Sequence, residues 1–189
     1  MINSRFAGGL IALALGAASF AAAPNSSVRD ILEKAARDVV AHTAVPVYVP
    51  ASLQSLDAAG NGGCAFASSN GDGFDIKIYG RVTEYGKTSP LPCEANNVAL
   101  LAEIHGQKKQ EPEVEKRRGM RRVVLRDGTP GWFSPVSCGG SCAPATLYWQ
   151  TSRASYWLQM RLPSTVSKSD QLRQLVDAVN SSELVLPER

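Results

Sequence analysis

The sequence has few of the side chains that most often carry catalysis. It has two histidines, His42 and His105, among 189 residues, and neither belongs to a catalytic or metal-binding motif. It also lacks an H-E-x-x-H pair, a Walker phosphate-binding loop, a G-x-G-x-x-G fingerprint and an EF-hand loop. We therefore expect no metal and no nucleotide cofactor.

Both histidines have an ordinary structural interpretation. His42 follows a predicted helix, where a basic ring near the negative end of the helix dipole is stabilising. Glu103 and His105 lie on the same face of a predicted strand, a spacing suited to a metal pair or an acid–base pair. No third ligand is apparent nearby in the sequence. We therefore assign no catalytic residue.

Beyond its N-terminus the sequence has no apolar run long enough to cross a membrane. Arg5 precedes an uncharged apolar stretch, 8–18, which is typical of a signal peptide and too short for a transmembrane helix. A buried N-terminal helix would be expected to show a polar face, which this stretch lacks. Ser19-Phe20-Ala21 fits the small-x-small pattern of signal peptidase. We predict cleavage after this triplet, which leaves 22–189 as one α+β domain in the periplasm or outside the cell.

The charge of the predicted mature chain is close to balanced. Loss of residues 1–21 removes one of the 20 basic residues, which leaves 19 against 17 acidic residues and a net charge of +2. This balance argues against nucleic acid as the main partner. About 168 residues remain, enough for one domain with its own hydrophobic core. Disulfides are therefore expected to reinforce the fold rather than to replace a core.

The four cysteines are even in number, which in an exported chain indicates two disulfides, although three pairings are possible. A loop of two glycines and a serine separates Cys138 from Cys142 and can bring their Cα atoms to disulfide distance. We pair Cys138 with Cys142, and Cys64 with Cys93. A four-thiolate zinc site is disfavoured because the Cys64 and Cys93 spacing lacks C-x2-C knuckles. A redox pair is disfavoured because three residues, not two, separate Cys138 and Cys142.

Hydrophobic periodicity predicts one helix near each end of the mature chain. The first spans 27–41, with Ser27 as its cap. The second spans 167–182, with Ser167 or Ser169 as its cap. The second helix is the stronger prediction because an apolar stripe runs along it. The stripe consists of Leu172, Leu175, Val176 and Val179.

Several strands are predicted between these helices. The two prolines of 45–50 limit that segment to an extended or edge position, because each removes a ladder donor. The stretch 107–118 carries charges of both signs and almost no apolar residue, so we interpret it as a solvated loop or hairpin tip. A binding patch for anionic envelope polymers is the alternative interpretation of this stretch. The other predicted strands span 74–85 (with a break considered at Gly80), 98–105, 121–126, 146–150 and 155–162.

The last two predicted strands form a hairpin through residues 151–154. If this short connection sets the register, Trp149 faces Tyr156 on the core side. Tyr148 and Trp157 then meet on the opposite face. The core side would carry Leu147, Trp149, Tyr156, Leu158, Met160 and Leu162.

These elements predict an α+β fold, a single curved antiparallel sheet with an N-terminal and a C-terminal amphipathic helix. The succession of PVYVP, VVLRDGTPGWF, LYWQTSRASYWLQMRL and SDQLRQLVDAVNSS resembles a family of uncharacterised bacterial envelope domains. That family is common in sigma-factor-linked membrane proteins and lipoproteins, and the resemblance covers about 45–182. It implies a curved sheet crossed by a closing helix, and it brings no catalytic residues. Four cysteines and no anchoring transmembrane helix depart from the family pattern, which weakens transfer of a sigma-factor-linked role.

The leading functional hypothesis is a non-enzymatic exported domain that binds or inhibits another envelope or secreted protein. Aromatic side chains are the usual anchors of such a surface. The alternative for these side chains is a place in the core or beneath a helix. The candidates are Trp132, Phe133, Tyr148 and Trp157.

The second hypothesis, from a different class, is a hydrolase or a thiol-redox enzyme. It would use Ser141 or the Cys138–Cys142 pair. The stretch 139–143 only approximates the G-x-S-x-G elbow of serine hydrolases, and no histidine follows it in the chain. A histidine within hydrogen-bond reach of Ser141 or of either sulfur would favour the enzyme.

Overall fold

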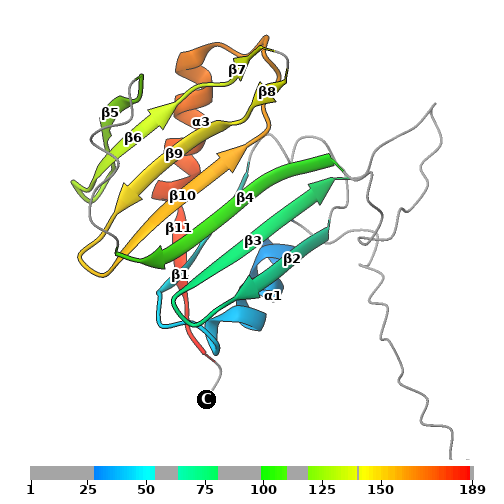
Figure 1. The fold of residues 1–189 in the computed structure, drawn as a ribbon, viewed down its shortest axis with the longest axis vertical. Coiled ribbons are helices and arrows are strands. Elements are labelled where there is room, and N and C mark those ends of the chain that lie inside the picture. The colour runs from blue at the N-terminus through cyan, green and yellow to red at the C-terminus, as the bar shows by residue number, and fades with distance from the viewer. Residues whose placement is uncertain (1–27, 54–63, 81–98, 110–118, 140, 188–189) are drawn as a thin grey trace, which may run out of the picture.

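The computed structural model describes residues 28–53, 64–80, 99–109, 119–139 and 141–187 (Figure 1). The predicted signal peptide, 1–21, lies outside these residues. The described chain is mixed α and β, and its largest element is an open antiparallel sheet of seven strands in the order β2-β3-β4-β10-β9-β6-β5. Its strands are β2 (Cys64–Ser69), β3 (Gly73–Gly80), β4 (Ala99–Lys108), β5 (Arg121–Val124), β6 (Pro130–Ser134), β9 (Ala145–Gln150) and β10 (Ala154–Met160).

Two small sheets accompany the large one, so the prediction of a single sheet is only partly right. β1 (Val47–Pro50) pairs with β11 (Ser182–Val185). β7 (Ser137–Cys138) pairs with β8 (Cys142–Ala143) to form a hairpin. Among the described strands β1 pairs only with β11, in keeping with the edge position predicted from its prolines.

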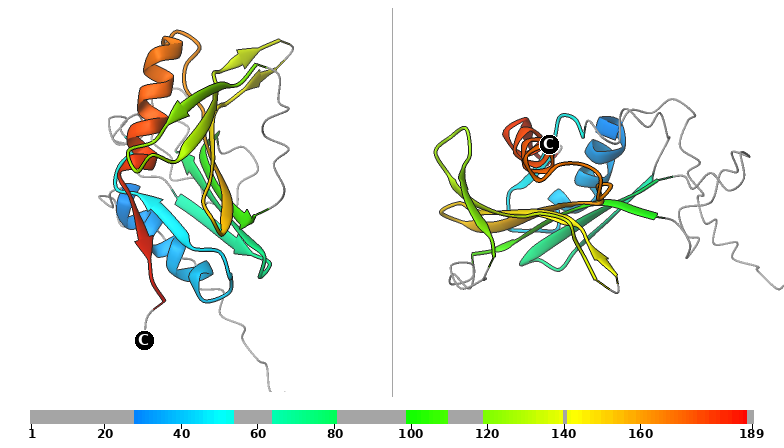
Figure 2. Two further views of the ribbon diagram at one scale, coloured as in Figure 1. Left: turned by 90° about the vertical axis from the view of Figure 1, so that its left-hand side faces the viewer. Right: turned by 90° about the horizontal axis from the view of Figure 1, so that it is seen from above.

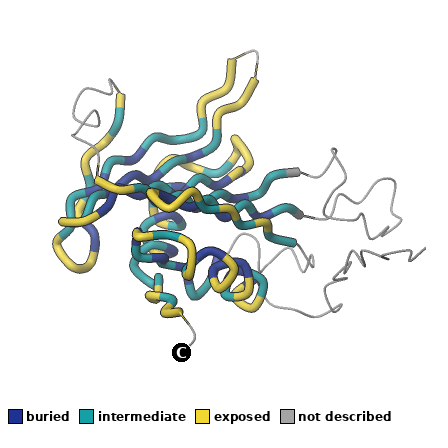
Figure 3. The backbone as a smooth tube through the Cα atoms, turned by 60° about the horizontal axis from the view of Figure 1, so that its bottom comes forward, coloured by how far each residue is buried: buried dark blue, intermediate teal, exposed yellow. Residues whose placement is uncertain are grey.

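Both helices lie on one face of the large sheet (Figure 2). We call it the inner face, and the opposite one the outer face. α1 (Val28–Val40) packs against β2 and β3, and α3 (Lys168–Asn180) packs against β9 and β10. The β1–β11 ribbon lies on the same side and contacts both helices. Among the described elements, no helix covers the outer face (Figure 3).

Both predicted helices are present, α1 within 27–41 and α3 within 167–182, while the predicted cap Ser27 lies outside the described residues. Ser167 is the N-cap of α3, where its hydroxyl accepts a hydrogen bond from the backbone N–H of Asp170. Leu175 is fully buried, and Leu172, Val176 and Val179 pack at the edge of the core. In the part of the chain that the structure describes, neither helix is long and apolar enough to span a bilayer.

The hairpin of β9 and β10 has the predicted register. Trp149 lies opposite Tyr156, and Tyr148 lies opposite Trp157. The connection is one residue shorter than predicted because Ala154 already belongs to β10. The backbone N–H of Thr151 donates to the carbonyl of Ala154, which closes the turn at this point.

Other strand boundaries shift for local reasons. β4 continues to Lys108, so the first residues of the predicted charged loop are strand, while 110–118 lies outside the described residues. β5 ends at Val124 because a turn follows, in which Gly128 adopts a positive φ of 84°. Thr129 donates to Asp127 from its backbone N–H and its hydroxyl, and these bonds lower the pKa of the Asp127 carboxyl.

A glycine in β4 is required by the packing of the inner face. A Cβ on Gly106 would lie 2.3 Å from Cε1 of Phe74 and 3.0 Å from Cε1 of Tyr156, so no larger residue fits between these rings. The Tyr156 hydroxyl donates to the carbonyl of Pro46 at 3.0 Å, which ties the sheet to the segment before β1. Burial raises the pKa of Tyr156, and neighbouring Tyr48 adds to this effect.

Removing the side chain of Leu175 tests how α3 is attached. Leu175→Ala should lower the free energy of unfolding by about 2–5 kcal/mol, because it leaves a cavity between α3 and the sheet. Asp177→Ala is the matched control: its side chain is exposed on the same helix, and we expect a change of about 0.5 kcal/mol or less. Denaturant unfolding measures both. Equal small losses would show that α3 does not hold the sheet in solution.

Candidate functional site

A row of polar and aromatic side chains crosses the outer face at one level of the sheet. Strand alternation turns every second residue outward, and the register aligns five such residues on β3, β4, β10, β9 and β6. We call these five the outer-face row. Its members are Asp75, His105, Trp157, Tyr148 and Trp132. On β5, Arg122 pairs with Trp132 and extends the row toward the sheet edge.

His105 is held on two sides within this row. Its Nδ1 is hydrogen-bonded to Oδ1 of Asp75. Because an ionised carboxylate only accepts, the proton lies on Nδ1. Its ring stacks on the indole of Trp157, with centroids 3.5 Å apart and planes 12° from parallel. Nε2 is buried and has no hydrogen-bond partner among the described residues. The imidazole is therefore fixed in one orientation.

The remaining rings contact one another in sequence. Tyr148 lies nearly parallel to Trp157 at 6.4 Å, and its centroid is 6.3 Å from that of Trp132 in an edge-to-face pair. Gln150 donates to the Tyr148 hydroxyl at 3.2 Å. Tyr148 is only 8% exposed, while Trp132 and Trp157 are partly exposed. The row is thus a half-buried aromatic centre, not a set of free rings.

A polar row runs parallel to the outer-face row, one outward position further along the strands. Lys77 and Glu103 form an ion pair at 3.6 Å on β3 and β4. In register with Glu103, the row continues through Gln159, Thr146 and Ser134 on the next three strands. The aromatic centre is therefore bordered by side chains that can donate and accept hydrogen bonds.

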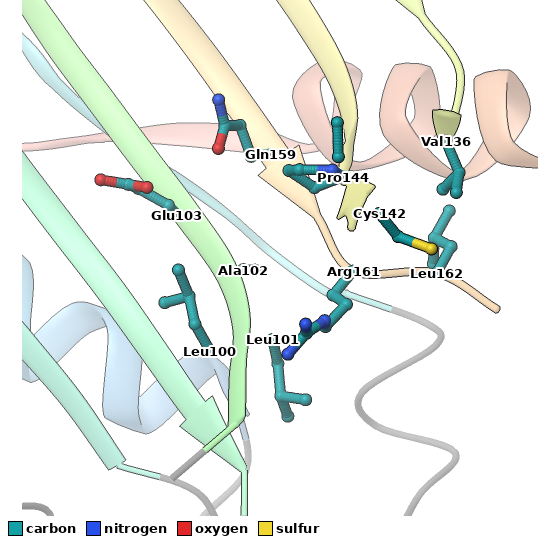
Figure 4. A pocket seen from close by; sticks show the side chains of 11 residues that line it. Leu100, Leu101, Ala102, Glu103, Val136, Cys142, Pro144, Gln159, Arg161 and Leu162 are labelled. Atoms are coloured by element: carbon teal, nitrogen blue, oxygen red, sulfur yellow. The ribbon is translucent and has the colours of Figure 1, made fainter. Parts of the chain in front are cut away.

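Two hollows lie at opposite ends of β4. One, of about 320 Å³, is polar and lies where β3 begins, lined by Ser68, Asn70, Asp75, His105 and Gln107 among others. The other, of about 220 Å³, is mainly apolar and lies beside the β7–β8 hairpin (Figure 4). The outer face therefore combines the row with a polar and an apolar recess.

Three of the four predicted surface aromatics come together, and one does not. Trp132, Tyr148 and Trp157 are members of the outer-face row. Phe133 points to the inner face, where it is 3% exposed and part of the core. Its assignment to a binding surface is therefore corrected, because adjacent residues of a strand face opposite sides.

The structure adds Asp75, which sequence reasoning missed. The alternation of apolar and polar residues in the predicted strand 74–85 places Asp75 on the polar side. This alternation is the sequence signal that could have identified Asp75 as a surface residue. Its partner is on β4, and the two strands are separated by 81–98, so no short connection indicates their register. Glu103 and His105 do share a face, as predicted. The described residues contain no cluster of three or more His, Cys, Asp or Glu that could hold a metal ion.

Cys138 and Cys142 form a disulfide that closes the β7–β8 hairpin, which confirms this predicted pair. Cys64 begins β2, while Cys93 lies outside the described residues, so their pairing stays a prediction. Ser141 is exposed beside the disulfide. Within the described residues, neither His42 nor His105 hydrogen-bonds to Ser141 or to either sulfur. The contact that would favour an enzyme is therefore not made.

Replacing His105 tests whether the row is fixed. His105→Ala removes the donor to Asp75 and the ring stacked on Trp157, so we expect the free energy of unfolding to fall by about 1–2 kcal/mol. Gln107→Ala is the control on the same strand and face, with an expected change of about 0.5 kcal/mol or less. Chemical denaturation of both variants measures the difference. A loss for His105→Ala no larger than the control's would mean that the row is not held together in solution.

Comparison of the chain with known proteins finds no relative. No family model matches the chain, and no curated protein and no solved structure matches it. The resemblance to envelope domains of unknown function therefore stays a prediction.

Proposed function

We propose that the chain is an exported, non-enzymatic domain that binds another envelope or secreted protein through the outer face of its sheet. One observation carries this proposal: three aromatic side chains and a fixed histidine lie side by side across four strands, on a face that no described helix covers. Tyrosine and tryptophan are enriched among the residues that dominate the binding energy of protein interfaces.

The composition of the face favours a protein partner. Protein interfaces have a largely apolar or aromatic centre and a polar rim. The outer-face row supplies such a centre, and the parallel row from Lys77 to Ser134 supplies part of such a rim. The ring faces of His105 and Trp157 cover each other, so a flat ligand has no place to stack between them. A broad surface that contacts ring edges and polar side chains suits this face better.

Export rests on two features. The apolar stretch after Arg5 predicts a signal peptide, and the Cys138–Cys142 disulfide is of the kind that persists in oxidising compartments. In this proposal the sheet is curved, and the two amphipathic helices support it from behind. The alternative of a hydrolase or a thiol-redox enzyme gains no support from the contacts of Ser141, Cys138 or Cys142.

The export step predicts a defined N-terminus. Mass spectrometry of the protein recovered outside the cytoplasm should find a chain that begins at Ala22, because Ser19-Phe20-Ala21 fits the signal-peptidase pattern. Phe20→Leu, which leaves the two small residues in place and creates no new small-x-small triplet, serves as the control and should keep the cleavage position. Recovery of the exported protein with Met1 still attached would contradict the predicted signal peptide.

Site-specific photocrosslinking tests the binding face. A photoreactive residue in place of Gln159, beside the aromatic centre, should give a discrete adduct with a protein partner in envelope extracts. The same residue in place of Arg173, exposed on α3, is the control and should give none.

A second change links the adduct to the row itself. Trp132→Ala in the Gln159 crosslinking variant should reduce the adduct severalfold, because truncation of an aromatic anchor commonly costs 1–2 kcal/mol or more, roughly a factor of ten. Adducts of equal yield from Gln159 and Arg173, or an adduct that survives Trp132→Ala, would remove the outer face as the binding surface.

A further inference from the structure

We propose that the apolar pocket beside the β7–β8 hairpin is a binding site for a small linear carboxylate. In this site the apolar chain occupies the pocket and the carboxylate pairs with Arg161. This site goes beyond the proposed protein-binding surface and does not depend on a protein partner.

The pocket is lined mainly by apolar side chains from three parts of the fold. They come from the start of β4, from the β7–β8 hairpin with its flanking residues, and from the residue after Arg161 (Figure 4). Binding sites for small molecules have this character, an apolar lining with a few placed polar groups. The apolar lining includes Leu100, Leu101, Val136, Ala143, Pro144 and Leu162.

The size of the pocket limits the ligand. Its volume is about 220 Å³. A cavity of about 150 Å³ lined by apolar side chains accepts benzene, which has six carbons. By proportion, this pocket has room for roughly nine non-hydrogen atoms. A linear chain of about eight carbons therefore matches this volume.

Arg161 gives the pocket its charge preference. Its side chain lies beside Leu101 at the edge of the pocket, and it has no carboxylate partner among the described residues (Figure 4). A guanidinium presents two parallel N–H donors to a carboxylate, which favours this group over a hydroxyl or an amide. An anionic head group on Arg161 is therefore the match.

The acidic residue of the pocket does not oppose this placement. Glu103 is already paired with Lys77 at 3.6 Å. Glu103 pairs with Gln159 across β4 and β10, and the backbone N–H of Arg161 donates to the carbonyl of Leu101. Glu103 and Arg161 are therefore two residues apart in register on the outer face. Two residues along a strand correspond to a separation of about 6.6–6.8 Å between their backbone positions. The ligand carboxylate is thereby directed to Arg161 and away from Glu103.

The pocket walls are held in place without a ligand. Gln171 of α3 is 3% exposed, and its Oε1 accepts the backbone N–H of Val136 at 2.9 Å, just before β7. Its Nε2 donates to the carbonyl of Val166 at 2.8 Å, so the amide is satisfied on both sides. The Cys138–Cys142 disulfide then closes the hairpin. A site with fixed walls loses little freedom on binding, which favours affinity for a small ligand.

Octanoate, octanol and acetate distinguish the contribution of the apolar chain from that of the carboxylate. In a backbone-amide NMR titration of the mature protein, octanoate should give saturable shifts centred on Leu101, Ala143 and Leu162. Acetate lacks the chain and should give none there, and octanol lacks the charge and should bind at least about tenfold more weakly.

Two variants test the role of the cation. Arg161→Gln should weaken octanoate by at least about tenfold and leave octanol within about twofold, because only the charged contact is lost. Arg153→Gln removes an exposed arginine of the β9–β10 turn and should change neither ligand. Octanoate shifts that are absent or lie elsewhere, equal binding of octanoate and octanol, or unchanged octanoate binding by Arg161→Gln would each overturn the site.

Discussion

The pairing register of β4 with β10 determines both faces of the sheet. It places Gly106 opposite Tyr156 on the inner face and His105 opposite Trp157 on the outer face. Gly106 leaves space for the rings of Phe74 and Tyr156, because a Cβ at this position would collide with Phe74 and crowd Tyr156. A slip of one residue would turn His105 into the core and Gly106 outward. The same constraint that packs the core therefore builds the outer-face row.

The helical layer is connected to the outer face through a few specific contacts. Leu175 and Ala178 attach α3 to the inner face, while Gln171 of the same helix holds the segment that leads into the β7–β8 hairpin. Tyr156 reaches through the core to the carbonyl of Pro46 and thereby fixes the start of β1. Packing of α3 on the inner face thus positions the β7–β8 hairpin, which forms one wall of the apolar pocket. The pocket therefore depends on residues that do not line it.

The sequence predicts those parts of the molecule that local rules determine. The stripe from Leu172 to Val179 and the cap Ser167 define α3, and a connection of a few residues fixes the register of Trp149 with Tyr156. The Asp75–His105 contact is different, because the connection 81–98 is too long for a turn type to set the register of β3 with β4. The apolar pocket likewise combines β4, β10 and the hairpin, which are distant in sequence. Phe133 is a separate case, since strand alternation alone places its side chain on the other face of the sheet from that of Trp132.

The order of contacts along the outer-face row decides what kind of partner suits it. Asp75 is hydrogen-bonded to the edge of the His105 ring, and Trp157 covers one face of that ring. Tyr148 and Trp132 continue the chain of contacts toward β5. Each ring is immobilised by its neighbours, so a partner would lose little side-chain freedom of this surface on binding. Because the ring faces are largely used within the row, recognition must come from ring edges and from the adjacent polar row, each of which offers many weak contacts. Contacts of that kind give useful affinity only when many form at once, which requires a partner surface as wide as several strands.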